Sequence, residues 1–416
     1  MKIILKCLVF LLSLNTFYSQ SFQYLDDKQS IPRYYVATQK WIDGTSMSDK
    51  NVDGYIYKKN ASKYYVLDDF IQGNIISASL FGVKGDGVTD DSKSLQKAFD
   101  IATKYGLSLY LPYGTMIVSE DLIINMGNKA QKIKIAGAGV SNTIIRNVST
   151  NTRYALKITG DYFNNLDIKD FRIERDLASP VPTGNVGLCI EKQVYATMEN
   201  IEVIRFKQGI EIIDVSTLYM KNVNARFCGN GYVFSKLENN GQTNPNLIEM
   251  HSCVATSNTK WGMIFVNGHS VNFYNSLFED NFEGGINFSY DGTNGLNSLN
   301  VNGCYFEGNK GTDVLIKSSA PGTHNFIGNT FNRVSDKKFT TNSILLDAKT
   351  KGKNLNILNL IGNGFFNASS YKSSSERKSV KVIADDYNLI KVFDSNIYSS
   401  DIDKPNYHQN IRISTK

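Results

Sequence analysis

The chain of 416 residues has little cysteine and no recognisable metal-binding pattern. Its five cysteines include no CxxC pair, and none is spaced with histidine as zinc ligands are. Cys7 lies in the N-terminal apolar segment, and the others fall in expected strands and turns, where small buried thiols are common. We therefore expect free, buried and unreactive thiols rather than disulfides at Cys189, Cys228, Cys253 and Cys304.

Clustered positive charge and long apolar runs are also missing. The net charge is +6 and the basic residues are scattered, which argues against a nucleic-acid partner. So mild a charge fits either solubility alone or an anionic polysaccharide partner. The apolar run at residues 7–14 is too short to span a bilayer and follows Lys2 and Lys6, as in a secretory signal over residues 1–20. We therefore expect a secreted or periplasmic protein without a membrane anchor.

Several familiar catalytic motifs are absent. The sequence has no glycine-rich phosphate loop, no HExxH pair and no nucleophile elbow. It does have a dense turn signal at residues 81–92, where Gly82, Gly85 and Gly87 permit a tight bend. Residues 89–92 then offer candidate N-caps for a helix ending at Gly106. Its apolar face consists of Leu95, Ala98, Phe99, Ile101 and Ala102. Residues 109–111 are expected to form a strand, followed by the turn Pro112-Tyr113-Gly114.

This order of strand, GDG turn, helix, strand and PxGT turn resembles the N-terminal part of pectate-lyase-like proteins. That superfamily of right-handed parallel β-helices includes family-28-related glycosidases, polysaccharide lyases, uronan epimerases and phage tailspikes. The resemblance implies an all-β solenoid with an N-terminal capping helix. It is specific for the fold and not for a reaction, because the motif builds the cap and carries out no chemistry.

A repeat supports the solenoid from about residue 130 onward. Positions 225, 253, 276, 304, 329 and 363 align in steps of 28, 23, 28, 25 and 34 residues, which suits coils of three short strands. An asparagine follows at a fixed distance in four coils, which predicts a stacked column in an inward turn: Asn230, Asn258, Asn281 and Asn309. The acidic residues beside that column, such as Glu279 and Glu307, are therefore interpreted first as turn residues.

We divide the chain into four parts. Residues 1–20 are the signal, 21–77 a small β module with a hairpin around 58–63, 78–400 the β-helix and 401–416 a polar tail. Material placed like the β module serves attachment or capping in tailspike-like proteins.

Alternation along the repeated strands predicts which side chains point inward. One expected core column is Met220, Ile248, Val271 and Leu299, and the other is Asn222, Met250, Phe273 and Val301. One expected outward column is Lys221, Glu249, Asn272, Asn300, Asn325 and Asn359. The other is Glu202, Val223, His251, Tyr274, Asn302 and Ile327. Neighbouring coils lie ~4.8 Å apart, so column members are contact neighbours. A polar column of this kind either lines a sugar-binding groove or is the solvated face of a sheet.

The outward columns supply a candidate catalytic cluster. The polygalacturonase motifs (Asn-Thr-Asp, Asp-Asp, Gly-His-Gly and Arg-Ile-Lys) and the epimerase Asp-Pro-His-Glu are absent, so neither activity is carried over by resemblance. Glu249 and His251 are expected to act as acid and base, with Lys221 and Tyr274 binding or polarising the substrate. The expected substrate-binding residues are Glu202, Asn272 and Asn300. The plainer interpretation is a Lys–Glu cross-strand pair beside a surface histidine. A second candidate is Asp280 with Glu283 and, from the coil before, Lys260 and Trp261.

These features predict a secreted carbohydrate-active enzyme that cleaves the glycosidic bonds of an acidic polysaccharide. Hydrolysis would need two carboxylates, whereas β-elimination needs a base and a group that neutralises a uronate. No cofactor is expected for hydrolysis, and calcium is expected only for a lyase. The alternatives are a non-catalytic polysaccharide-binding or surface-structural β-helix, and a tailspike-like depolymerase. The chain is expected to be a monomer or a homotrimer.

Overall fold

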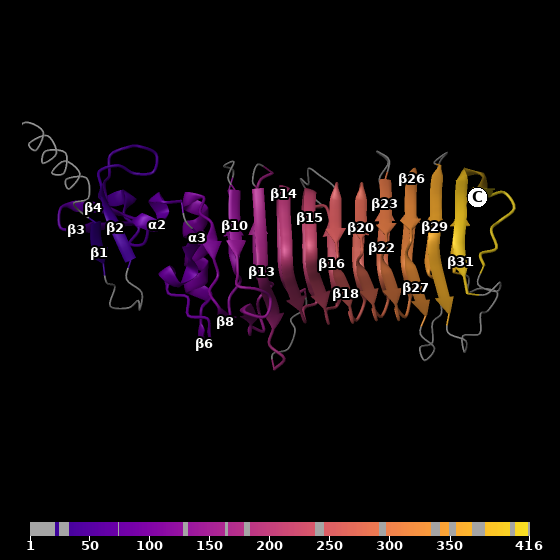
Figure 1. The fold of residues 1–416 in the computed structure, drawn as a ribbon, viewed down its shortest axis with the longest axis horizontal. Helices are drawn as coiled ribbons and strands as arrows, with labels where there is room; N and C mark the ends of the chain where they lie inside the picture. Colours follow the sequence, from indigo (N-terminus) through magenta and orange to yellow (C-terminus); the bar gives the residue numbers. More distant parts are fainter. Residues whose placement is uncertain are drawn as a thin grey trace, which may run out of the picture.

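The molecule is a long rod of stacked coils (Figure 1). This computed structural model describes residues 21–24, 33–73, 75–127, 132–162, 165–178, 184–237, 245–290, 297–333, 342–348, 355–367, 379–399 and 404–414. The predicted signal peptide lies outside these residues. A small sheet marks the N-terminal end of the rod, and β31 (Ile390–Tyr398) lies near the other end.

The small N-terminal sheet is antiparallel, with the strand order β1-β2-β4-β3. Its strands are β1 (Ser21–Tyr24), β2 (Arg33–Thr38), β3 (Tyr57–Asn60) and β4 (Lys63–Leu67), and the short helix α2 (Asp68–Ile71) follows. β3 and β4 form a hairpin that pairs Tyr57 with Val66, at the place where the sequence predicts one. The proposed boundary at residue 77 stays a prediction, and β5 (Ile76–Ser77) already pairs with a strand of the solenoid.

The glycine-rich turn and the helix after it cover this end of the solenoid. Gly82, Gly85 and Gly87 all have positive φ angles, as a tight turn requires. The buried Asp91 carboxylate accepts hydrogen bonds from the backbone N–H groups of Lys84 (2.7 Å) and Gly85 (2.9 Å). Helix α3 (Ser92–Tyr105) then buries the predicted apolar face and ends at Gly106 in the left-handed conformation. The GDG motif is therefore a structural turn held by a carboxylate.

The solenoid consists of three parallel sheets, because each coil contributes one strand to each of them. In the central coils the first sheet contains β17 (Ile248–His251), β20 (Val271–Tyr274), β23 (Asn297–Asn302) and β26 (Gly322–Ile327). The second contains β18 (Val254–Thr256), β21 (Leu277–Glu279), β24 (Tyr305–Glu307) and β27 (Thr330–Arg333). The third contains β16 (Asn230–Ser235), β19 (Trp261–Val266), β22 (Gly284–Tyr290), β25 (Thr312–Ser318), β28 (Ile344–Ala348) and β30 (Val380–Ala384).

Several longer strands bend from one sheet into the next. They are β13 (Asn165–Arg175), β14 (Val186–Ile204), β15 (Gln208–Arg226), β29 (Asn356–Asn367) and β31. The remaining strands of the rod are β6 (Asp86–Asp90), β7 (Leu109–Tyr110), β8 (Gly114–Val118), β9 (Ile123–Asn125), β10 (Lys132–Ala136), β11 (Thr143–Asn147), β12 (Tyr154–Thr159) and β32 (Arg412–Ser414). The predicted fold, a parallel β-helix, is therefore confirmed.

One left-handed residue makes each corner between the first and second sheets. In successive coils it is Asp170, Asn200, Asn222, Ser252 and Asn275, and afterwards Gly303, Gly328 and Gly362. Asn, Asp and Gly are the residues that adopt this conformation most readily, since it crowds larger side chains. The corners therefore fix the registration of each coil.

Stacked side chains fill the interior. Phe278, Phe306, Phe331 and Phe365 stack in consecutive coils with ring centroids 5.0, 4.7 and 4.8 Å apart. The turn from the second to the third sheet holds an asparagine ladder in which Asn258 Nδ2 donates to Asn281 Oδ1 (2.8 Å) and Asn281 Nδ2 to Asn309 Oδ1 (2.9 Å). All four cysteines outside the N-terminal segment are free and buried, as predicted, and burial raises the pKa of Cys228 to about 11.

The predicted registration is wrong by two residues at one coil. The structure pairs Leu218 with Ile248 and Met220 with Met250, instead of Met220 with Ile248. Asn222, predicted in the core, is therefore the exposed corner residue, and Val223, predicted to face outward, is buried. Asn230 also lies outside the asparagine ladder. Cys228 occupies the predicted position of Asn230, and its backbone N–H donates to Asn258 Oδ1 (2.9 Å). A slip of two residues preserves the inward–outward alternation, so hydrophobic pattern alone does not detect it.

Candidate functional site

The candidate site lies on the outer surface of the first sheet. Tyr219 and Lys221 come from β15, Glu249 and His251 from β17, and Tyr274 from β20; we call these five residues the His251 cluster. Residues two apart on a strand point to the same face, which is why each strand supplies a pair of outward side chains. The pairing places Tyr219 beside Glu249, Lys221 beside His251, and His251 beside Tyr274.

His251 lies between two tyrosine rings. Its ring centroid is 5.2 Å from that of Tyr219 at an interplanar angle of 38°, and 4.6 Å from that of Tyr274 at 18°. Its Nε2 atom is 3.7 Å from Glu249 Oε2, is shielded from solvent and makes no hydrogen bond to any other described residue. The side chains of His251 and Glu249 are 34% and 43% exposed, so a ligand on the sheet can reach both. The cluster holds an imidazole in a defined position next to a carboxylate, as acid–base chemistry requires.

Lys221 is held by a carboxylate that the sequence analysis did not single out. Its Nζ donates to Glu199 Oε1 at 3.1 Å, and this bond raises the pKa of Lys221. Glu249, the predicted neighbour of Lys221, lies instead beside Tyr219. The two-residue slip explains why Tyr219 was missed. Glu199 was missed through a separate one-residue error, because the predicted column places Glu202 beside Val223, where the structure has Ile201. The left-handed corner residues Asn200 and Asn222 are the sequence signal that could have revealed it.

The predicted asparagine column beside the cluster is present. The structure aligns Glu249, Asn272, Asn300, Asn325 and Asn359 in consecutive coils. Asn300 Nδ2 donates to Asn272 Oδ1 at 2.7 Å, and the same bond links Asn325 to Asn300 and Asn359 to Asn325. We call these four asparagines the outer asparagine row. Asn300, Asn325 and Asn359 each use one N–H within the row, so their second N–H is available to a ligand, whereas Asn272 Nδ2 donates to the backbone oxygens of Ile248 and Ser270.

Glu202 does not take part in this site. It follows the left-handed corner at Asn200 and lies on the outer side of the second sheet, with its side chain 3% exposed. There it forms ion pairs with Arg172 Nε at 2.6 Å and with Arg226. Its predicted place in the outward column beside Val223 is therefore wrong, because it pairs with Asn224 on the second sheet and its carboxylate is buried in an ionic network there.

The second candidate site also lies away from the His251 cluster. Asp280 is a left-handed residue directly after β21, at the corner between the second and third sheets. Glu283 directly precedes β22 of the third sheet, and Trp261 packs over Gly284. These residues belong to the turn that carries the asparagine ladder, as the structural interpretation of that turn predicts.

A pocket extends the first-sheet surface toward the N-terminal end. It has a volume of about 400 Å³ and is lined by Lys132, Asn165, Leu166, Asp167, Tyr195 and Thr197. Tyr195 is 59% exposed and lies in the coil before Thr217 of β15. The pocket and the His251 cluster therefore lie on one sheet, in neighbouring coils, and a linear ligand could contact both.

The donor set does not fit a calcium site. Calcium takes six to eight oxygen ligands, most often from clustered carboxylates. Across the part of the chain that the structure describes, no three His, Cys, Asp or Glu residues are arranged to hold a metal ion. No step below is therefore assigned to a metal ion. The longest described helix, α3, has 14 residues, and no described helix has the length and apolarity to cross a membrane.

Comparison with known proteins agrees with the fold and its cap. Residues 75–169 match the family model of the rhamnogalacturonase A/epimerase, pectate-lyase-like domain. The molecule thus has a pectate-lyase-like parallel β-helix fold, and the resemblance predicted from the glycine-rich cap is confirmed.

The relatives with known sequences or structures share this scaffold. The preneck appendage protein of Bacillus phage PZA is 36% identical over 81 residues, which are 20% of this chain and 8% of that protein. Full-length tailspike protein 2 of an Escherichia coli O157:H7 bacteriophage has a TM-score of 0.63 at 13% identity, covering 94% of this chain and 52% of the tailspike. The A-module of the Azotobacter vinelandii mannuronan C-5 epimerase AlgE4 has a TM-score of 0.51 at 17% identity. The match covers 81% of this chain and 99% of the A-module. The chain thus matches a small fraction of the phage appendage protein and about half of the tailspike, and these likenesses concern the fold.

Proposed function

We propose that this protein binds an acidic polysaccharide along the outer surface of the first sheet and cleaves it by β-elimination at the His251 cluster. The observation that carries the proposal is the position of His251, stacked between Tyr219 and Tyr274 with its Nε2 atom 3.7 Å from the Glu249 carboxylate. A fold neighbour is by name a mannuronan C-5 epimerase, so the same scaffold carries chemistry at C5 of a uronan. Export through residues 1–20 would place the protein where such polymers occur.

In the proposed reaction, His251 accepts the proton from C5 of a uronate unit. The electron pair of that C–H bond forms the C4–C5 double bond, and the bond from C4 to the glycosidic oxygen breaks. The Tyr274 hydroxyl donates a proton to the departing oxygen. Lys221 exchanges Glu199 for the uronate carboxylate, which it neutralises, and Glu249 stabilises the protonated imidazole.

Elimination is favoured over hydrolysis by the carboxylates of the site. Hydrolysis requires two carboxyl groups on either side of the scissile bond, about 5–9.5 Å apart. The His251 cluster contains one, Glu249, and the nearby Glu199 is hydrogen-bonded to Lys221. An imidazole, a phenol and an ammonium group fit the needs of elimination better.

A depolymerisation assay tests the proposal. The mature protein is incubated with polygalacturonate, alginate and glucuronate polymers, and with dextran as an uncharged control. Reducing ends and the ultraviolet absorbance of the unsaturated uronate are both recorded. We expect both signals on one uronan, and a loss of at least about 100-fold in rate for His251→Ala, the usual scale for removing a general base. His408→Ala, which changes an exposed histidine near the C-terminal end, is the matched control and should keep full activity.

Each other outcome has a definite meaning. Reducing ends without the new absorbance would contradict elimination and favour hydrolysis. Full activity in both His251→Ala and Glu249→Gln would show that the His251 cluster is not the cleavage site.

A second candidate function is polysaccharide binding without cleavage. The outer asparagine row favours it, because four amides in one line offer repeated hydrogen bonds without any group suited to chemistry. Binding to a glycan array with no product on any polymer would support this function. Sedimentation velocity would then show whether the chain is a monomer or a homotrimer.

A further inference from the structure

A second pocket lies on the third sheet, away from the His251 cluster. It has a volume of about 320 Å³ and is lined by Val266, Ser289, Tyr290, Lys317, Ser318, Ser319 and Asp347. The strands that form it are β19, β22, β25 and β28, in four consecutive coils. Its volume is near the lower end of the range for small-molecule sites, which suits a single small ligand.

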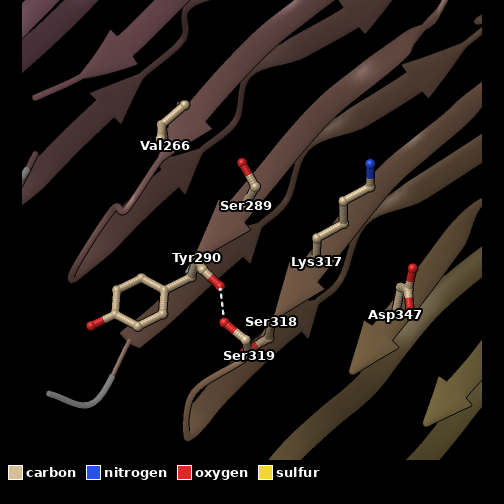
Figure 2. A pocket seen from close by; sticks show the side chains of 7 residues that line it. All are labelled: Val266, Ser289, Tyr290, Lys317, Ser318, Ser319 and Asp347. Atoms are coloured by element: carbon tan, nitrogen blue, oxygen red, sulfur yellow. Dashed lines mark hydrogen bonds between the residues drawn. The ribbon is translucent and has the colours of Figure 1, made fainter. Parts of the chain in front are cut away.

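Three polar side chains of this pocket form one outward row. The pairing places Ser289 beside Lys317 and Lys317 beside Asp347. Their backbones are therefore ~4.8 Å apart from one coil to the next, and all three side chains leave the same face of the sheet. Figure 2 shows the Ser289 hydroxyl, the Lys317 ammonium and the Asp347 carboxylate directed to the same side. A hydroxyl, a cation and an anion are thus presented together.

The two charges of the row are not neutralised by any residue that the structure describes. Neither Lys317 nor Asp347 has an ion-pair partner among the described residues, although they are neighbours in adjacent coils. Asp347 Oδ1 is also shielded from solvent and accepts no hydrogen bond from the residues that the structure describes. Leaving a carboxylate oxygen shielded without a donor is unfavourable, so the geometry calls for a donor from a ligand.

The rest of the pocket has its hydrogen bonds in place. Ser289 Oγ donates to the backbone oxygen of Phe265 at 3.1 Å, so its lone pairs remain free to accept. At the edge of the pocket, Ser319 Oγ donates to the backbone oxygen of Tyr290 at 3.0 Å (Figure 2). Val266 adds an apolar wall. Counting described residues alone, the pocket therefore offers a cation without an ion-pair partner (Lys317), two acceptors and an apolar contact.

We propose that this pocket is a second carbohydrate-binding site, which takes one uronate unit of an acidic glycan. Lys317 pairs with the uronate carboxylate, and the sugar hydroxyls donate to Asp347 Oδ1 and to Ser289 Oγ. The C–H groups of the sugar ring lie against Val266. The site is on another sheet from the proposed cleavage site and does not depend on cleavage, so it would hold a polymer or a cell-surface glycan independently.

Monosaccharide binding to the whole chain tests the site. The probes are galacturonate, glucuronate and mannuronate, each compared with its uncharged hexose, by saturation-transfer NMR. We expect at least one uronate to bind about tenfold more tightly than its hexose, as loss of one charge-assisted hydrogen bond predicts. Lys317→Met and Asp347→Asn should each weaken the binding of that uronate by about tenfold. Lys381→Met, which changes an exposed lysine on β30 of the same sheet, should not.

The design separates this site from the His251 cluster. Uronate binding that survives in both pocket variants but disappears in His251→Ala would overturn the pocket proposal and leave the proposed function intact. Equal binding of uronates and hexoses, or no uronate binding by the wild type, would also overturn it. Thermal unfolding of every variant identifies any that fails to fold. If Lys317→Met fails to fold, Lys317→Gln replaces it.

Discussion

Asparagines stack along this rod in two places, once inside it and once outside. Within the inner ladder, Asn281 Nδ2 donates to Asn309 Oδ1 and to the backbone oxygen of Ala255, while its Oδ1 accepts from Asn258 Nδ2. Within the outer row, Asn300 Nδ2 donates to Asn272 Oδ1 and Asn300 Oδ1 accepts from Asn325 Nδ2, so one N–H of the Asn300 amide is left outside the row. The same side chain at the same spacing thus serves two purposes. Inside, it satisfies buried backbone groups; outside, it leaves hydrogen-bonding capacity for a ligand.

The histidines show the same contrast. His324 is buried in the core between Leu299 and Leu358 of the neighbouring coils. His251 lies on the outer face between two tyrosines. Burial lowers the pKa of His324 to about 4, because the core disfavours the charged imidazole. The same residue type is therefore a core residue at one position of the coil and a partly exposed residue of the outer face at another.

The largest expected effect comes from breaking the inner ladder. Asn281→Ala removes four hydrogen bonds of the side chain: two that its Nδ2 donates, to Asn309 Oδ1 and the backbone oxygen of Ala255, and two that its Oδ1 accepts from Asn258. We expect a loss of about 4 kcal/mol in the free energy of unfolding, since several buried polar groups lose their bonds together. Chemical denaturation followed by circular dichroism measures it. Asn300→Ala is the matched control and should cost less than about 1 kcal/mol; equal losses at the two positions would contradict the comparison.

The second effect depends on pH. In the unfolded chain His324 titrates near pH 6.5, and in the folded chain near 4, so between these values the unfolded state binds the extra proton. Stability should therefore decrease as the pH falls from about 6.5 toward 4, by at most about 3 kcal/mol from this residue. Denaturation at several pH values should show a shallower decrease for His324→Leu than for the wild type. His408→Ala should behave like the wild type.

This experiment compares variant with wild type because another buried group acts in the opposite direction. Burial raises the pKa of Asp313 to about 6, so its folded form holds a proton between about 3.8 and 6. Its contribution to stability is therefore present at low pH and is lost as the pH rises through about 6. A parallel pH profile for His324→Leu and the wild type would contradict the role assigned to His324.

The comparison also explains what the sequence could predict. The glycine-rich cap and the inward–outward alternation predict the fold and most columns, because both are local patterns repeated many times. The registration between Tyr219 and Glu249 could not be predicted from them, since a shift of two residues keeps every side chain on its face. Only the left-handed corner, Asn222 in one coil and Ser252 in the next, marks the true alignment. This error misplaced Lys221 and hid Tyr219, and a separate one-residue error, Glu202 beside Val223, hid Glu199. The main residues of the cluster were therefore predicted, but not their contacts.

The smallest expected effect concerns the outer row and sharpens the contrast with the inner ladder. If its free amide groups bind a polysaccharide, Asn300→Ala should weaken binding by about threefold to tenfold, the value of one hydrogen bond, while hardly changing stability. Affinity electrophoresis in gels containing the uronan that the protein binds measures this directly. Lys381→Met, which changes an exposed lysine on the third sheet outside both proposed binding sites, should leave this binding unchanged. An Asn300→Ala variant that binds as well as its parent would mean that the outer row, like the inner ladder, stabilises the coils and recognises nothing.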